Sequence, residues 1–276
     1  MAALGTLLVH IDAGPHNAAR LAVARDLAAR HGAEVTALYA VMSSFVEVPL
    51  ALEAAGPALD ALRALDDERR ASAREAVERL AATPGPRVRW AEADSIAPIG
   101  AFVAQAAYAD LLVLGQREPQ PFASGTPADF VESVVIGSGR PALVLPHVGV
   151  PATPGRNVLV AWKESAASVH ALAGAMPLLQ KAERVTVVEW AADDSRSAGP
   201  LGIASHLAGH GVTAERRRYP ETPATTGELI LSMAADIGAD LVVMGCYGHS
   251  RAREWALGGA TRTLLASMTV PVLMAH

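Results

Sequence analysis

The chain has 276 residues, enough for one large domain or two of ordinary size. Hydrophobic residues make up 51% and charged residues 18%, which excludes a disordered protein, and a net charge of −5 argues against binding to nucleic acid or to an acidic membrane. A single cysteine excludes an internal disulfide, and no apolar run approaches the ~20 residues of a membrane span, so we expect a cytoplasmic protein.

The first half alternates short apolar runs with stretches of helical spacing. Thr126 and Pro127 have the order of an N-cap and a first helical residue. Strands followed by helices in this way predict a parallel, doubly wound α/β sheet. The expected strands are 6–11, 34–41, 87–91, 110–114 and 141–145, and the expected helices are 17–30, 60–82, 96–108 and 128–136, with an irregular segment at 42–59.

The pattern restarts after a proline-containing linker at 148–156. Asp110 and Asp240 are 130 residues apart, as are Gly115 and Gly245, which indicates a duplicated unit. Val9 and Val160 are 151 apart, so the second copy lacks 21 residues, most simply from 42–82. We expect domains at 1–147 and 157–276. The second has strands at 157–162, 184–190, 212–219, 240–244 and 271–275, and helices at 165–181, 223–237 and 262–267.

A glycine motif follows the strand at 240–244. Gly245, Gly248 and Gly258 have the spacing G-x2-G-x9-G, and a helical stretch follows. Glycines let a backbone approach phosphate closely, and a helix start offers free N–H groups to an anion. The pattern therefore indicates phosphate contact, although the same glycines can simply shape a turn and cap a helix.

This spacing resembles the nucleotide motif of the universal stress protein family, and the likeness extends over both halves, as in the tandem type of that family. The resemblance implies two Rossmann-like domains, similar to adenine nucleotide alpha hydrolases, each with a five-stranded parallel sheet of order 3-2-1-4-5. It also implies ATP or another adenine nucleotide, with or without Mg2+, at the switch point between strands 1 and 4. Gly259 departs from the family, which has Ser or Thr there, whereas Thr261 matches it.

The site implied by the resemblance lies in the second half. Val187 and Val188 would lie against the adenine, and the glycine loop would meet the phosphates. Lys163 stands where the family commonly has an Asp beside the nucleoside. It either approaches a phosphate or is a solvated lysine. No catalytic or metal-binding residue is assigned. The full set is Ala161, Trp162, Lys163, Val187, Val188, Met244, Gly245, Gly248, His249, Ser250, Arg251, Gly258, Gly259, Ala260 and Thr261.

The first half keeps Gly115 but not the rest of the motif. Glu118 and Asp129 stand opposite Gly248 and Gly259, and two carboxylates would repel a triphosphate. We therefore expect no phosphate site in the first half. Asp12 is retained at the end of the first strand, where we interpret it as a turn or cap residue.

Three other candidates are weaker. Cys246 has no basic partner in sequence and is interpreted as an unreactive thiol. His206 and His210 have a metal-binding spacing but no third ligand. The run of arginines at 216–218 lies on an expected edge strand, where charge discourages aggregation.

The sequence thus predicts a regulatory nucleotide-binding protein rather than an enzyme, with weak ATP hydrolysis at most. A nucleotide-free scaffold is the alternative, favoured by Gly259 and Lys163. The apolar fifth strands, Pro141–Leu145 and Pro271–Ala275, would pair with each other, either within one chain or in a homodimer. Neither nucleic acid nor membrane is expected as a partner.

Overall fold

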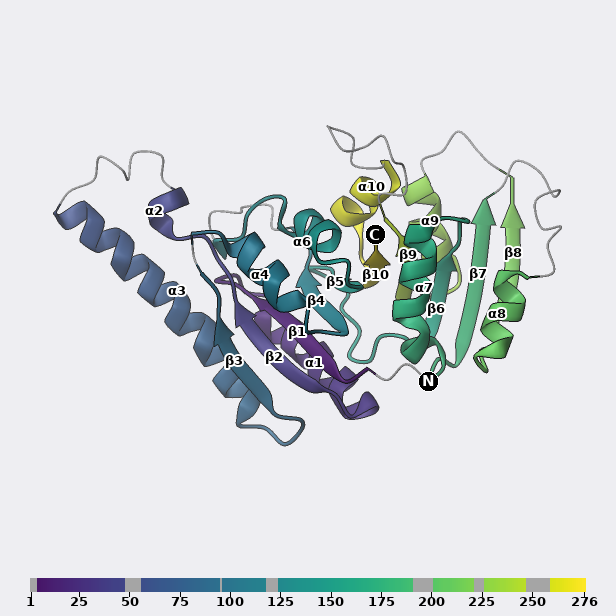
Figure 1. Cartoon of the computed structure of the whole chain (residues 1–276), viewed down its shortest axis with the longest axis horizontal. Coiled ribbons are helices and arrows are strands. Elements are labelled where there is room, and N and C mark those ends of the chain that lie inside the picture. The colour runs from purple at the N-terminus through teal and green to yellow at the C-terminus, as the bar shows by residue number, and fades with distance from the viewer. Residues whose placement is uncertain are drawn as a thin grey trace. The chain divides into compact units, whose positions relative to one another are not determined.

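The computed structural model describes residues 4–47, 56–94, 96–117, 124–190, 201–220, 226–246 and 259–276. The chain divides into two compact units (Figure 1). We call Leu4–Arg140 the first unit and Pro141–His276 the second unit. Both consist of strands alternating with helices, which confirms the α/β class predicted from the sequence.

The first unit has four parallel strands in the order β3-β2-β1-β4. In this unit α1 packs against α3, and α4 packs against α6. Its strands are β1 (Thr6–Ile11), β2 (Glu34–Tyr39), β3 (Val88–Glu92) and β4 (Leu111–Gly115), and its helices are α1 (Asn17–His31), α2 (Ser44–Glu47), α3 (Pro57–Ala81), α4 (Pro98–Ala106) and α6 (Phe130–Ser138).

The second unit has five parallel strands in the order β8-β7-β6-β9-β10, which is 3-2-1-4-5 within its repeat. A sixth strand, β5, pairs antiparallel with β10. The strands are β5 (Ala142–Leu145), β6 (Asn157–Ala161), β7 (Arg184–Trp190), β8 (Glu215–Tyr219), β9 (Leu241–Gly245) and β10 (Val272–Ala275), and the helices are α7 (Ala166–Leu179), α8 (Ile203–Gly209), α9 (Thr226–Asp236) and α10 (Gly259–Ser267).

Local signals account for these elements. The central strands are apolar on both faces and almost wholly buried, as expected where helices cover both sides of a parallel sheet. Gly32 ends α1 in the left-handed conformation, with φ of 72°. Ser165 begins α7 by accepting a hydrogen bond from the N–H of Ser168.

In both units an aspartate carboxylate accepts hydrogen bonds from the backbone at the start of the first strand. The Asp110 carboxylate accepts hydrogen bonds from the N–H groups of Gly5 and Thr6, both at 2.9 Å. Asp240 does the same for residues 155–157, at 2.9–3.1 Å. This shared contact gives the repeated aspartate a structural reason, because it satisfies backbone donors where two neighbouring strands begin.

The two units also pair their first and fourth strands in the same register. Leu7 is opposite Leu111 in the first unit, and Val158 is opposite Leu241 in the second. These partners are related by the 151- and 130-residue offsets found in the sequence. Positions in the two units can therefore be compared one to one around these strands.

The units differ most between their second and third strands. The first unit has α3 here, a helix of 25 residues on which only Ala73 and Val77 are buried. Buried Arg25 donates to the carbonyl oxygen of Leu80 at 2.7 Å and so ties down the end of this helix. The second unit has the shorter α8. Among the described helices none is both long and apolar enough to cross a membrane.

Some predicted boundaries were wrong. The helix expected to start at Thr126 and Pro127 begins at Phe130, because the Thr126 hydroxyl hydrogen-bonds to Asp12 instead of capping a helix. The segment 42–59, expected to be irregular, contains α2, whose Ser44 binds Asp66 of α3.

Candidate functional site

Three predicted site residues meet at the carboxyl end of the second unit's sheet. Ala161 ends β6, and its neighbours across the sheet are Val188 on β7 and Met244 on β9. Strand β6 leads to β7 on one side while β9 lies on the other, so the chain reverses its direction of travel across the sheet here. Such a switch point is where ligands bind in open parallel sheets.

The side chains around this point differ in exposure. Trp162 and Ala161 are half-buried, and Lys163 is exposed. Val187 and Val188, predicted to lie against an adenine ring, are 0% exposed. Their side chains are covered by protein, so a base would meet the ends of the strands rather than these two valines alone.

Gly245 is required for packing. A Cβ at this position would lie 2.4 Å from the backbone nitrogen of Ser168 and 2.6 Å from the carbonyl carbon of Ala167, both in the first turn of α7. Strand β9 and α7 therefore approach so closely that only glycine fits. This gives the first glycine of the motif a structural role that holds with or without a ligand.

The rest of the predicted loop is only partly described. Gly248, His249, Ser250, Arg251 and Gly258 lie outside the described residues. Gly259, Ala260 and Thr261 form the first turn of α10, and Thr261 is buried.

Cys246 directly follows β9 and is buried. Its thiol donates to the carbonyl oxygen of Ala275 at 3.2 Å, and burial raises its pKa to about 12. A thiol that stays protonated is a poor nucleophile, which agrees with the unreactive role expected from the sequence.

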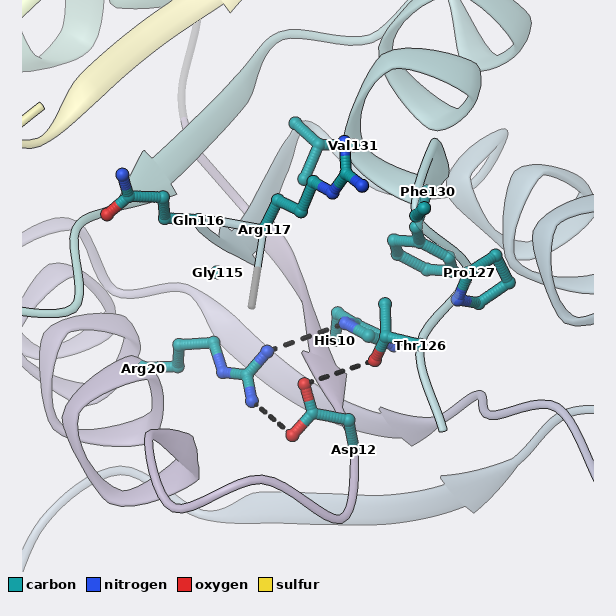
Figure 2. A pocket seen from close by; sticks show the side chains of 11 residues that line it. His10, Asp12, Arg20, Gly115, Gln116, Arg117, Thr126, Pro127, Phe130 and Val131 are labelled. Carbon is teal, nitrogen blue, oxygen red and sulfur yellow. Dashed lines mark hydrogen bonds and ion pairs between the residues drawn. The ribbon is translucent and has the colours of Figure 1, made fainter. Parts of the chain in front are cut away.

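The equivalent edge of the first unit holds a pocket (Figure 2). Its volume is about 20 Å³, which is space for about one water molecule. The end of β1, α1, the end of β4 and the segment before α6 all contribute to it. The lining residues are His10, Asp12, Arg20, Gly115, Gln116, Arg117, Thr126, Pro127, Ala128, Phe130 and Val131.

A buried ion pair lies at this edge. Arg20 and Asp12 are both 3% exposed, and an Arg20 terminal nitrogen donates to the Asp12 carboxylate at 2.7 Å. The same nitrogen donates to the side-chain oxygen of Asn17 at 2.7 Å. Burial by itself would raise the pKa of Asp12, but the charge of Arg20, aided by His10 and by hydrogen bonds from Arg20 and Gly14, holds it below its ordinary value.

His10 completes the cluster as a neutral ring. Its Nε2 lies 2.8 Å from the carbonyl oxygen of Ala40, so this nitrogen carries the proton and Nδ1 faces Arg20 at 3.5 Å (Figure 2). The ring stacks on Phe130 with centroids 4.0 Å apart. Burial, reinforced by the Arg20 charge, lowers the pKa of His10 to about 4.

Arg20 fills the space that a ligand would need. A Cβ at Gly115 would come within 2.9 Å of the Arg20 guanidinium, so this side chain lies directly against the end of β4. In the second unit the residues equivalent to His10, Asp12 and Arg20 are Ala161, Lys163 and Ala171. The first unit thus closes its switch point with its own side chains, whereas the second has small residues and a lysine.

Sequence reasoning missed Arg20 and His10. Asp12 does form the expected turn, accepting a hydrogen bond from the N–H of Gly14 at 2.8 Å, but its ion pair was not foreseen. One signal was available, because Arg20 follows Asn17 by three residues and precedes Leu21 on the buried face of α1. A charged side chain on an apolar helix face needs a buried partner.

The weaker candidates have structural roles. Arg216 and Arg218 both donate to Glu189 on the neighbouring strand, at 2.8–3.1 Å, and Arg217 donates to Glu215 of its own strand at 2.8 Å, so all three arginines are paired within the sheet. The His206 and His210 rings lie 4.7 Å apart. Among the described residues no three His, Cys, Asp or Glu side chains converge in a way that could hold a metal ion.

Among known protein families, a match is found for the second unit in particular. A sequence model of the Universal stress protein family matches residues 155–276. Universal stress protein Slr1230 from Synechocystis is 29% identical over 172 residues, a match that covers 59% of this chain and 57% of that relative. The match thus spans little more than half the length of this curated relative.

Solved structures show the same fold over nearly the whole chain. A universal stress protein from Archaeoglobus fulgidus has a TM-score of 0.72 at 17% identity, covering 99% of this chain and 96% of that one. The functionally unknown protein PA1789 from Pseudomonas aeruginosa has a TM-score of 0.58 at 17% identity, covering 98% and 92%. Residues 155–276 thus match the universal stress protein family, and the fold of the chain is similar to that of a solved universal stress protein.

Proposed function

We propose that the second unit binds ATP or a related adenine nucleotide as a regulatory ligand. The observation that carries this proposal is the alignment of Ala161, Val188 and Met244 across three neighbouring strands at a switch point, with the glycine motif following β9 in sequence. The base would lie towards β7 and the phosphates beyond β9. Nucleotide level would then change the conformation of the protein or its choice of partner rather than drive steady turnover.

The first unit would bind no nucleotide. The buried Arg20–Asp12 pair lies against Gly115, and the pocket there has space for about one water molecule. A nucleotide could enter only by displacing a buried ion pair, which would leave charges without partners. One nucleotide per chain is therefore the expected stoichiometry.

The fifth strands are proposed to pair with each other, within one chain or between two. Val144 and Leu143 of β5 are paired with Val272 and Leu273 of β10 in an antiparallel ladder. This pairing uses the apolar edge of β10 within one chain, so it supports the intrachain arrangement over a homodimer joined at the same edge.

The decisive experiment compares wild type with Gly248→Asp. Both proteins would be purified without added nucleotide and denatured, and the released small molecules would be identified by mass spectrometry. ATP or ADP near one per chain in the wild type, absent from the variant, is the expected result, because a carboxylate at this loop would repel phosphate.

The matched control is Gly209→Asp, which adds the same charge to α8, where an added Cβ has no atom within 4 Å, and should leave the bound nucleotide unchanged. A folded wild type that releases no nucleotide, and shows no heat of binding with added ATP, would overturn the proposal. The nucleotide-free scaffold would then be the better description.

A further inference from the structure

Lys163 reverses the charge at the centre of the proposed site. In the first unit, Asp12 stands at the end of the first strand and is paired with Arg20. The two units share the register of their first and fourth strands, so Lys163 occupies the position of Asp12, and Ala171 that of Arg20. The swap therefore removes both members of an ion pair and leaves one cation.

No carboxylate of the described residues forms an ion pair with Lys163, and its side chain is exposed at the end of β6. The following residue, Glu164, is also exposed. Ala161 and Ala171 carry no charge, so within the described part of the chain the Lys163 cation has no buried counter-charge at this strand end. An anionic ligand group would complement it.

The sheet order indicates which part of a nucleotide would meet this lysine. Strand β6 lies between β7 and β9. A nucleotide with its base at β7 and its 5′-phosphates beyond β9 must cross the end of β6 with its ribose. Lys163 would then lie beside the sugar hydroxyls, where a carboxylate would accept hydrogen bonds from unmodified hydroxyls but an ammonium group can only donate.

We infer that the ligand of the second unit is an adenine nucleotide with a phosphate on its ribose, at the 2′ or 3′ oxygen, and that Lys163 selects it. This inference rests on the proposed nucleotide-binding function and adds the class of ligand. A carboxylate favours a free ribose and a basic residue favours a ribose phosphate, a choice that dinucleotide-binding folds also make.

Three isomers provide the test. Adenosine 2′,5′-bisphosphate, adenosine 3′,5′-bisphosphate and ADP have the same atoms and the same two phosphates, so calorimetry on the full chain compares the position of one phosphate alone. We expect one of the two bisphosphates to bind about tenfold more tightly than ADP, the size of one charge-assisted hydrogen bond. Which one binds identifies the phosphorylated oxygen.

Variants then locate the preference. Lys163→Ala should lose the preference for the bisphosphate over ADP, and Lys163→Asp should prefer ADP. Lys181→Ala, which removes the only other lysine of the chain, should retain the wild-type preference. Glu164→Gln removes one negative charge from the same loop and should strengthen the binding of all three isomers equally.

Two results would overturn the inference. Wild type that binds ADP as tightly as both bisphosphates would show that Lys163 reads no ribose phosphate, while leaving nucleotide binding itself intact. A preference that persists in Lys163→Ala would assign it to another residue. Failure of the wild type to bind any isomer, or ATP, would instead contradict the proposed function and the inference with it.

Discussion

At the scale of single residues, the two units use the same positions for different purposes. Arg20, Asp12 and His10 form a buried polar cluster that stabilises the first unit only while each group keeps its partners. The equivalent Ala171, Lys163 and Ala161 in the second unit form no such cluster. The first unit thus fills this strand edge with its own side chains, whereas the equivalent positions of the second unit are two alanines and a lysine.

The buried histidine makes stability depend on pH. The pKa of His10 falls from 6.5 to about 4 on folding, chiefly through burial. Between these values the unfolded chain binds a proton that the folded protein does not, so stability is full above pH 6.5 and decreases as the pH falls towards 4. Protonation of His10 alone should lower the free energy of unfolding by about 3 kcal/mol across this pH range.

Urea unfolding of the wild type and of His10→Gln at several pH values between 7.5 and 4 would measure this. The variant should be less stable at pH 7.5 but should lose about 3 kcal/mol less on acidification. His206→Gln, at an exposed position, should follow the wild type. Identical pH dependence in wild type and His10→Gln would show that His10 is not held neutral by the fold.

At the scale of elements, the sequence predicted the strands best. Runs such as Thr6–Ile11 and Arg184–Trp190 are mostly apolar and rich in leucine or valine, and both were predicted with their observed ends. Boundaries failed where a side chain bonds to a distant residue. Thr126 has the local character of an N-cap, but its hydroxyl binds Asp12, which is 114 residues away.

Close contact between elements explains part of the glycine motif. An alanine at Gly245 would press against the backbone of α7, which cannot move without disturbing the sheet. We expect Gly245→Ala to lower the free energy of unfolding by about 1–3 kcal/mol in the absence of nucleotide. Gly209 in α8 has open space around it, so Gly209→Ala should leave stability unchanged or raise it by up to about 1 kcal/mol.

Chemical denaturation of nucleotide-free protein would distinguish a role of Gly245 in packing from a role in nucleotide binding. If Gly245→Ala proved as stable as the wild type and lost only nucleotide binding, the glycine would serve the ligand and not the packing of α7 on β9.

At the scale of the whole molecule, the repeat could be predicted from the sequence, but the contacts between residues far apart in the chain could not. The ungapped offset between Gly115 and Gly245 and between Pro141 and Pro271 predicts a duplication. It assigns residues 141–145 to the first copy. The sequence predicted that the fifth strands pair with each other, but no local pattern reveals that β5 pairs with β10 of the same chain, between residues about 130 apart. The closed first-unit pocket was missed for the same reason, because Arg20 and Gly115 meet only after folding.

The pairing of β5 with β10 makes a prediction about fragments of the second half. All four residues of β5 are buried, and its ladder covers the edge of β10. A fragment of residues 147–276, which keeps the linker but lacks β5, should therefore expose the apolar edge of β10 and self-associate through it, whereas a fragment of residues 141–276 keeps that edge covered. The shorter fragment should also melt at a lower temperature, because it loses the burial of Leu143 and Val144. Light scattering coupled to size-exclusion chromatography, with thermal melts, would measure both. Equal mass and equal melting temperature in the two fragments would mean that β5 contributes nothing to the second unit.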